Sequence, residues 1–421
     1  MLDMNVIREH ADIVKEAVKN KHCTADIDRL LELDVERREK IQKADDLKAV
    51  RNKVSQEIGE LKKTGRNADD AIRNMREVSS NIKDMDDDIK GIEQEMFEIQ
   101  MWIPNIPHET VPVGGEADNK TVAEWGTVIE PDFTVLPHYE IGENLHMLDL
   151  DRGARLSGSN FVAMSGQGSR LQRALINFML DLHIEKHGFT EVSVPFIVRR
   201  DIMFGTGQLP KLEEDMYHIE KDDMFLIPTA EVPVTNLHRG EILQADSLPV
   251  KNVAFTPCFR REAGSYGADT RGLMRIHQFD KVEMVMVTEP EHSYEALETL
   301  RSYAEEVLRL LELPYRVLSL ATGDLSFAAA KCYDLEVYAP GIKKWLEVSS
   351  ISNFEDFQAR RMNIRYRPEH DKKPCFVHTL NGSGLALPRV VIAIMEQYQT
   401  DEGTIQVPNV LRDYMKCDII K

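Results

Sequence analysis

Several features are scarce in this sequence, and each scarcity excludes a class of protein. The five cysteines are widely scattered and never form a Cys-x-x-Cys pair, so neither a disulfide framework nor a zinc cluster is indicated. No apolar run approaches the roughly 18 residues that a membrane span requires, and the first ten residues have no apolar stretch. The Gly-x-x-x-x-Gly-Lys-Ser/Thr phosphate loop is missing as well. We therefore expect a cytoplasmic protein with reduced thiols and no membrane partner.

Positive charge is also scarce, but it is unevenly distributed. The chain carries 52 Lys and Arg against 71 Asp and Glu, a net charge of -19, and an acidic surface repels nucleic acid. Between Lys48 and Arg76, however, eight bases face only four acids. Because salt screens surface charges beyond about 8 Å, a basic patch that is held away from an acidic body can act on its own.

The apolar residues around this basic segment predict a helical hairpin. From Ile72 they recur in steps of three and four, which trace a narrow stripe along a coiled-coil helix. That stripe is Ile72, Met75, Val78, Ile82, Met85, Ile89, Ile92, Met96 and Ile99, and a less regular one upstream is Ile41, Leu47, Val50, Val54, Ile58 and Leu61. Residues 63–67 break the pattern. We expect an antiparallel coiled-coil hairpin over about 27–100, with Lys62, Lys63 and Arg66 at its turn; a purely structural or dimerising hairpin is the alternative.

Composition changes after residue 103 and divides the chain. Prolines and glycines between Pro104 and Gly115 end the second helix, which predicts an N-terminal arm (1–103), a linker (104–130) and a larger domain (131–421). In that domain β-like runs alternate irregularly with helices, which favours an α+β fold with a largely antiparallel sheet. The expected strands are 191–198, 224–228, 250–256, 281–287, 315–320, 335–339 and 345–349, and the expected helices are 171–187, 291–311 and 388–399.

Three separated stretches of this domain carry recognisable motifs. The first is 188–195, where a long helix runs into a strand that ends at proline; the second is 259–264 with 270–279; the third is 381–389, a small-residue turn before the last helix. Each has a plainer interpretation alone: an ordinary connection, a surface salt-bridge network, or a helix start with proline at its first position. Together they resemble the three signature motifs of class II aminoacyl-tRNA synthetases, and the residues between them resemble the seryl enzymes.

The resemblance implies a class II catalytic domain that activates serine with ATP and transfers it to tRNA(Ser), with tRNA(Sec) left open. Attack of a carboxylate on the α-phosphate builds negative charge, which fixed arginines stabilise. By resemblance the catalytic residues are Arg260 at the α-phosphate and amino-acid carboxylate, Arg275 at the terminal phosphates and Arg389 at adenine. The ATP-binding residues implied in this way are Arg260, Arg261, Glu262, Arg275, Phe279, Glu347, Val348, Ser349, Ser350 and Arg389.

Serine recognition is assigned to a further set of residues. Glu283 lies between Val282 and Met284 on an otherwise apolar run, where an acid is costly unless it has a partner; on an edge strand it would simply point to water. The resemblance implies a serine site formed by Thr229, Ala230, Glu231, Arg260, Glu283, Asn381 and Ser383. Polar groups that a substrate hydroxyl satisfies reject alanine strongly, because alanine would leave them unpaired.

The stretch 346–353 resembles the family segment that contacts ATP. Through Glu347 and Ser350 it would also bind Mg²⁺, which prefers hard oxygen ligands. Ile351, Phe354 and Leu325-Ser326 depart from residues that are frequent in seryl enzymes, and they flank these proposed contacts.

The resemblance also predicts partners. The first motif would build a homodimer interface, and the hairpin would bind tRNA through Lys62, Lys63 and Arg66. A relative that loads a carrier protein or another tRNA is one rival, and the hairpin together with Glu283 and Ser383 argues against it. A non-catalytic RNA-binding descendant is the other rival; it would have lost Arg260, Glu283 or Arg389, and all three are present.

Overall fold

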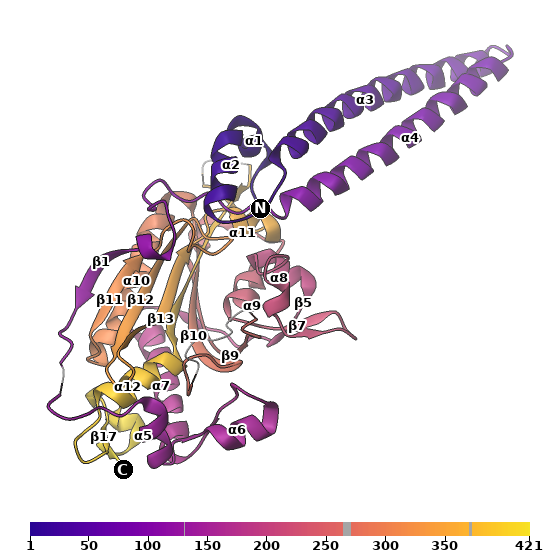
Figure 1. Ribbon diagram of the computed structural model, residues 1–421. Coiled ribbons are helices and arrows are strands. Elements are labelled where there is room, and N and C mark those ends of the chain that lie inside the picture. Colours follow the sequence, from indigo (N-terminus) through magenta and orange to yellow (C-terminus); the bar gives the residue numbers. More distant parts are fainter. Residues whose placement is uncertain (130, 264–270, 370–372) are drawn as a thin grey trace. The chain divides into compact units, whose positions relative to one another are not determined.

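The computed structural model describes residues 1–129, 131–263, 271–369 and 373–421 (Figure 1). Gly264 and Thr270 of the second motif lie outside the described residues. The chain divides into two compact units, Leu2–Pro104 and Asn105–Lys421, the second of which includes Met1. Among the described helices none is both long and apolar enough to cross a membrane.

The smaller unit contains the predicted hairpin. Its helices are α1 (Met4–Glu9), α2 (Ala11–Asn20), α3 (Ile27–Lys63) and α4 (Asp69–Gln100). With 37 and 32 residues, α3 and α4 each extend about 50 Å at about 1.5 Å per residue. Figure 1 shows them running antiparallel to each other, joined by a short turn. Just before α4, Asn67 Oδ1 accepts a hydrogen bond from the Asp69 N–H at 2.7 Å.

On α3 the seam differs from the predicted one at Ala44, which is 1% exposed and was not predicted, and at Val50. Val78, Ile82, Ile92 and Met96 of α4 are buried, as their spacing predicts. On α3, by contrast, Val50 is 44% exposed. A four-residue step from Leu47 leads to Arg51, which is half-buried, so Arg51 rather than Val50 continues the spacing of the seam.

An eight-stranded sheet forms the centre of the larger unit, in the order β1-β11-β12-β13-β16-β10-β9-β4. All neighbours are antiparallel except β4 and β9, which confirms the predicted α+β class. The strands are β1 (Lys120–Trp125), β4 (Thr190–Glu191), β9 (Val250–Phe259), β10 (Gln278–Thr288), β11 (Tyr315–Ser319), β12 (Lys331–Ala339), β13 (Lys344–Asn353) and β16 (His378–Ala386).

Three long helices share one continuous apolar core with this sheet. They are α7 (Gly166–Glu185), α10 (Ser293–Leu310) and α12 (Leu387–Gln397), whose buried residues join those of the strands in a single cluster. Burial of apolar surface is the main stabilising term in folding, so this core fixes the sheet on which the candidate site is built. Two shorter helices, α5 (His138–Asn144) and α6 (Leu150–Ser157), precede α7.

Shorter elements complete the unit. The helices α8 (Arg200–Thr206), α9 (Glu231–Thr235) and α11 (Phe357–Met362) contribute to the site described below. Helix α13 spans Arg412–Met415. The small sheets consist of β5 (Ile197–Arg199), β7 (Met224–Leu226) and β6 (His218–Ile219); β15 (Cys375–Phe376), β14 (Arg365–Arg367) and β8 (Ile242–Gln244); β2 (Leu148–Asp149) and β3 (Ala163–Met164); and β17 (Ile405–Gln406) and β18 (Ile419–Ile420).

Three local predictions were wrong. The run 191–198 is split between β4 and β5, which belong to different sheets, because Pro195 lacks an N–H for a ladder. The stretch predicted as a linker supplies β1, which pairs with β11. The small-residue turn at 381–386 is part of β16, where Gly382 leaves room for Ile351: a Cβ at Gly382 would lie 3.0 Å from Ile351 Cγ1.

Candidate active site

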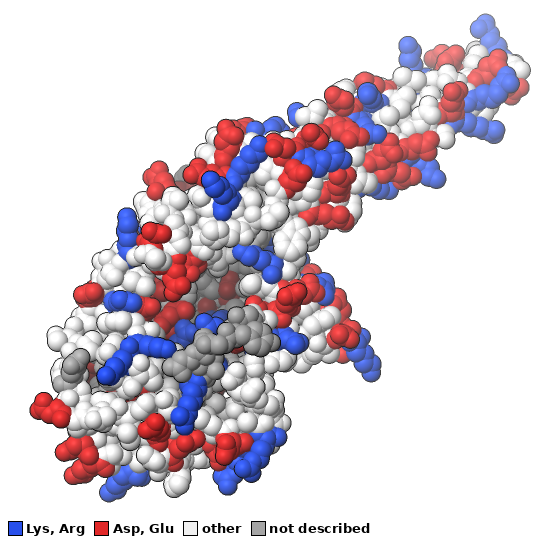
Figure 2. All heavy atoms as spheres, viewed as in Figure 1, with Lys and Arg blue, Asp and Glu red and all other residues white. Residues whose placement is uncertain are grey.

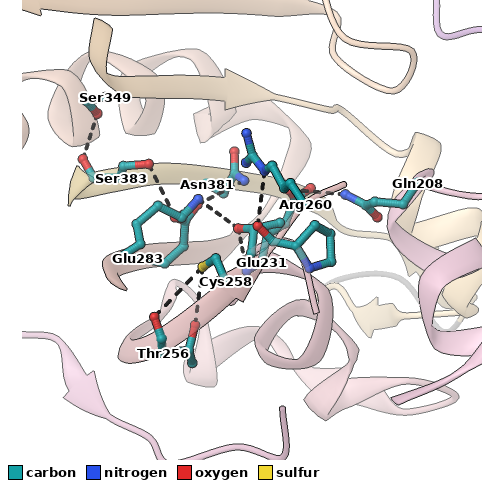
Figure 3. A network of polar contacts seen from close by, with 12 residues as sticks. Gln208, Glu231, Thr256, Cys258, Arg260, Glu283, Ser349, Asn381 and Ser383 are labelled. Atoms are coloured by element: carbon teal, nitrogen blue, oxygen red, sulfur yellow. Dashed lines mark hydrogen bonds and ion pairs between the residues drawn. The ribbon is translucent and has the colours of Figure 1, made fainter. Parts of the chain in front are cut away.

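A buried carboxylate lies where β10 and β16 pair. Glu283 is opposite Ser383 in the register and is 1% exposed. Its Oε1 accepts a hydrogen bond from Asn381 Nδ2 at 3.1 Å, and its Oε2 accepts one from Ser383 Oγ at 3.3 Å (Figure 3). Because β10 lies between β9 and β16, the alternative that Glu283 points to water from an edge strand is wrong.

Lys281 is a member of this cluster that the sequence analysis missed. Its Nζ lies 2.6 Å from Glu283 Oε2 and donates a hydrogen bond to Thr229 Oγ1 at 2.8 Å. Lys281 and Glu283 are two residues apart on one strand, so their side chains share a face. That spacing of a base and an acid in an apolar run was the signal that could have identified the pair.

Glu231 is a second buried acid, at the first residue of α9. Its Oε1 accepts a hydrogen bond from Gln358 Nε2 at 2.7 Å, and its Oε2 accepts one from Gln208 Nε2 at 3.5 Å. Burial, together with the nearby charge of Glu283, raises the pKa of Glu231 to about 7. Gln208 and Gln358 were also missed, since no local pattern relates residues so far apart in the chain to Glu231.

The predicted arginines lie around these acids. Arg260, just after β9, has its guanidinium 5.2 Å from the centre of the Phe279 ring, and its Nε donates to the Pro228 carbonyl at 3.3 Å. Arg275 Nη1 donates to Glu262 Oε2 at 3.0 Å. Each guanidinium is therefore held by a partner but keeps donors for an anionic substrate.

At the start of α12, Arg389 contacts Glu347 of β13. Its Nη1 donates to the Glu347 carbonyl at 2.8 Å and lies 3.1 Å from Glu347 Oε2. Arg389 is the third residue of its helix, after Leu387 and Pro388, and proline is well suited to a first helical turn. The helix start therefore directs this guanidinium toward β13.

One cavity of about 310 Å³ brings most of the predicted residues together. Figure 2 shows that this face of the larger unit is hollowed, with Lys, Arg, Asp and Glu side chains around the hollow. The predicted residues that line the cavity are Thr229, Glu231, Arg260, Glu262, Arg275, Phe279, Glu283, Glu347, Ser350, Asn381, Ser383 and Arg389. Gln208, Lys281, Ser326 and Phe354 line it as well.

Four predicted residues, all in the described part of the chain, are not among those that line this cavity. Ala230 and Val348 are fully buried in apolar clusters. Ser349 lies behind the wall and donates from Oγ to the Ser383 carbonyl at 2.6 Å. Arg261 has its guanidinium 5.8 Å from the centre of the Tyr217 ring.

Glu347 and Ser350 present a carboxylate and a hydroxyl to the cavity. Such oxygens suit Mg²⁺, which keeps several waters and takes further ligands from phosphates, so two protein ligands are enough. The Ser350 Oγ lies 3.2 Å from Cys332 Sγ. Burial, reinforced by Glu347, raises the pKa of the neighbouring Asp334 well above its ordinary value. Among the described residues no group of three or more His, Cys, Asp or Glu is arranged to hold a metal.

Comparisons with known proteins agree with this geometry. Residues 1–107 match the family model for the seryl-tRNA synthetase N-terminal domain, and residues 213–398 match that for the tRNA synthetase class II core domain (G, H, P, S and T). A serine–tRNA ligase of Geotalea uraniireducens is 54% identical over 416 residues, which cover 99% of this chain and 98% of the relative.

Two solved structures resemble the whole chain. The seryl-tRNA synthetase of Pyrococcus horikoshii complexed with ATP has a TM-score of 0.93 and 38% identity, covering 100% of this chain and 99% of the other. The cytoplasmic serine-tRNA ligase of Naegleria fowleri in complex with AMP has a TM-score of 0.89 and 30% identity, with the same coverage. The chain therefore belongs to the seryl-tRNA synthetase family.

Proposed function

We propose that this chain is a class II serine–tRNA ligase, which activates L-serine with ATP to seryl-adenylate and transfers the seryl group to the 3′ end of tRNA(Ser). The observation that carries the proposal is the arrangement of Glu283. This buried carboxylate is held by Asn381, Ser383 and Lys281 in the same cavity as Arg260 and Arg389. A small hydroxylated amino acid and a nucleotide are the substrates that such a cavity suits.

Serine binds at the end of the cavity that is lined by Glu283 of β10 and Ser383 of β16. Its hydroxyl donates to Glu283, beside Ser383, and its ammonium group lies against Thr229 and Glu231. The ionised form of Glu231 pairs with this ammonium group, and the pairing offsets the cost of keeping the charge buried. Alanine is rejected because it leaves the polar groups around Glu283 unsatisfied, whereas a larger side chain has to be excluded by size.

Positioning and charge stabilisation drive the first step. The serine carboxylate is already ionised near neutral pH, so an oxygen attacks the α-phosphorus without a general base. The new bond joins that oxygen to phosphorus, and the bond from the α-phosphorus to the bridging oxygen breaks to release pyrophosphate. Arg260 stabilises the charge at the α-phosphate and Arg275 that at the leaving phosphates, while Phe279 and Arg389 enclose adenine and Glu262 contacts the nucleotide.

Mg²⁺ accompanies the nucleotide in this proposal. Glu347 and Ser350 would hold it, and it would neutralise part of the phosphate charge. Because Arg389 contacts Glu347, the same arginine orients this carboxylate while its guanidinium faces the cavity. In the second step the terminal ribose hydroxyl of tRNA takes the seryl group and AMP leaves.

The proposal includes partners for each unit. The hairpin binds tRNA outside the anticodon, at its long variable arm, through the exposed side chains of Lys62, Lys63 and Arg66 at the turn. The segment 188–195 contributes to a homodimer interface. We expect the enzyme to work in the cytoplasm.

Pyrophosphate exchange into ATP tests the activity. With each of the twenty amino acids in turn, we expect exchange with serine alone, and aminoacylation of total tRNA with serine alone. Folded protein that binds ATP but shows no serine-dependent exchange would refute the assignment. Exchange without tRNA charging would favour a carrier-loading relative instead.

A further inference from the structure

Two buried histidines on α7 and just beyond it connect the candidate serine site to the opposite side of the sheet. His183 Nε2 lies 3.1 Å from the Gly384 carbonyl oxygen, and His183 Nδ1 lies 2.9 Å from His187 Nδ1. His187 Nε2 in turn lies 3.0 Å from Glu306 Oε2 on α10. His183 is fully buried and His187 is 5% exposed. We call this chain of contacts the histidine relay.

The number of protons in the relay follows from its end groups. A carbonyl oxygen and an ionised carboxylate only accept hydrogen bonds. His183 Nε2 must therefore carry a proton toward Gly384, and His187 Nε2 must carry one toward Glu306. The central contact between the two Nδ1 atoms requires one more. Three protons on four ring nitrogens are one more than two neutral imidazoles hold, so the two rings of the complete relay together carry one positive charge.

Some groups around the relay favour this extra proton, and others disfavour it. Burial lowers the pKa of His183 to about 4 and also lowers that of His187, against the opposing effect of Glu306. Lys186 pairs with Glu306, and Lys251 Nζ donates to the His187 carbonyl at 3.4 Å. Two neutral rings also pack on the relay: Tyr303 stacks on His187 at 3.9 Å between centroids, and Phe189 lies edge-on to His183 at 6.0 Å. Glu306 is thus the anion that favours the extra proton, but burial and the two lysines outweigh it, because the pKa of both histidines is lowered, and the relay holds this proton only at acidic pH.

The other end of the relay is tightly fitted to the site. Gly384 directly follows Ser383, and a Cβ at Gly384 would lie 2.4 Å from His183 Nε2. Ser383 itself is held from behind by Ser349 Oγ, which donates to its carbonyl at 2.6 Å. The side chain that faces Glu283 therefore sits on a segment of β16 that is fixed by two successive carbonyls.

We propose that His183 is a positioning residue for serine recognition: through the Gly384 carbonyl it holds Ser383 toward Glu283, and all three contacts of the relay are made together only when the two rings share an extra proton, balanced by Glu306. This inference rests on the proposed function, because it takes Ser383 as part of the serine site. It assigns no contact between the relay and the substrate.

Kinetics of the full-length enzyme test the role of His183. His183→Phe keeps the ring volume but removes the donor to Gly384, so the KM for serine in pyrophosphate exchange should rise about tenfold, the scale of one lost hydrogen bond. The KM for ATP should change less than twofold. His183→Gln restores an N–H and should recover most of the loss. Phe178→Leu, in the same helix, is the matched control for a general packing defect.

A second pair of variants tests the inference independently, in case His183→Phe does not fold. In Glu306→Gln the amide can donate to His187 Nε2, so two neutral imidazoles complete all three contacts. The ratio of wild-type to Glu306→Gln KM for serine should stay near one at acidic pH, where the wild-type relay holds its extra proton, and rise severalfold toward neutral pH, where the relay has lost it, because burial lowers the pKa of both histidines. Glu295→Gln, an exposed site on the same helix, should track wild type.

The outcomes separate the proposed function from the inference about the relay. Serine-dependent exchange by the wild type establishes the proposed function before any variant is compared. A pH-independent ratio for Glu306→Gln, or a KM for serine that is unchanged in folded His183→Phe, would overturn the inference and leave that function standing.

Discussion

Lys281 and Glu283 form a buried ion pair along one strand, with 2.6 Å between Nζ and Oε2 and side chains that are 8% and 1% exposed. The lysine also donates to Thr229, so one ammonium group joins two parts of the proposed serine site. Taking both charges out of water is costly, and the hydrogen bonds from Asn381 and Ser383 offset part of that cost. The pair thus fixes the carboxylate to which the serine hydroxyl is proposed to bind.

Replacing Lys281 with methionine should therefore affect both stability and recognition. It leaves the Glu283 carboxylate buried without a cation, which typically costs about 3 to 5 kcal/mol. We expect a lower melting temperature by calorimetry and a higher KM for serine. The double variant Lys281→Met/Glu283→Gln should recover stability but not serine activation. Loss of both to equal extents in the double and single variants would contradict the pairing.

Glu231 should make serine activation depend on pH. Burial raises its pKa to about 7, so below that pH the carboxylate takes up a proton and loses its attraction for the serine ammonium group. We expect the KM for serine to rise as pH falls from 8 to 6, with a smaller change in the KM for ATP. Glu231→Gln should have a high KM throughout, without this dependence. A wild-type profile that is flat below pH 7 would count against the assignment.

Glu231 also makes the stability of the fold depend on pH, but in the opposite sense from serine binding. Because the folded pKa of Glu231 lies above its unfolded value of 4.5, the folded chain binds more protons between these two pH values, and stability falls as pH rises through this window. Glu231→Gln should therefore melt at a higher temperature than wild type at pH 8, by about 2 to 4 °C for each kcal/mol recovered. At pH 4 the two should melt alike.

Sequence patterns predicted the elements whose periodicity is strong. The α4 stripe, the long β10 run and the helix after Pro388 gave correct element types because one face of each packs on a partner over many residues. The failures have local causes. Val50 was placed in the seam by hydrophobicity alone, and β16 was overlooked because its glycines and polar residues resemble a turn until two neighbouring strands pair with it.

For the site, the family resemblance identified the acids and arginines, but not the groups that hold them. Gln358 binds Glu231 from a helix 127 positions further along the chain, and His183 of the relay reaches Gly384 across 201 positions. Such contacts depend on the sheet order, which no local pattern encodes. Lys281 is the exception, because its distance of two residues from Glu283 is visible in the sequence.

Glu347 should set the requirement for Mg²⁺. In Glu347→Gln the carboxylate is replaced by an amide, which is a weaker ligand for a hard cation, while a carbonyl oxygen remains for Arg389. We expect the Mg²⁺ concentration for half-maximal exchange to rise about tenfold, with partial recovery of the rate at high Mg²⁺. Glu336→Gln, on the neighbouring strand, is the matched control. An unchanged Mg²⁺ dependence would remove Glu347 from the proposed metal site.

The hairpin turn provides a test that separates the two half-reactions. Replacing Lys62, Lys63 and Arg66 with alanine removes three exposed charges that lie far along α3 and α4 from the ends of those helices at Ile27 and Gln100. Each phosphate contact contributes about 0.9 to the slope of log affinity against log salt in duplex nucleic acid. The triple variant should bind tRNA more weakly, with a slope that is shallower by up to about 3, while serine-dependent exchange stays near the wild-type rate.

A matched triple variant decides whether position or total charge matters. Lys43, Lys83 and Lys90 are also exposed on the hairpin but lie away from its turn, so their replacement with alanine removes the same charge from the shafts of the two helices. If binding depends on the turn, this variant should keep most of its tRNA affinity and its salt slope. Equal losses in the two variants would mean that the arm attracts tRNA only through its overall charge, and the proposed recognition at the turn would be wrong.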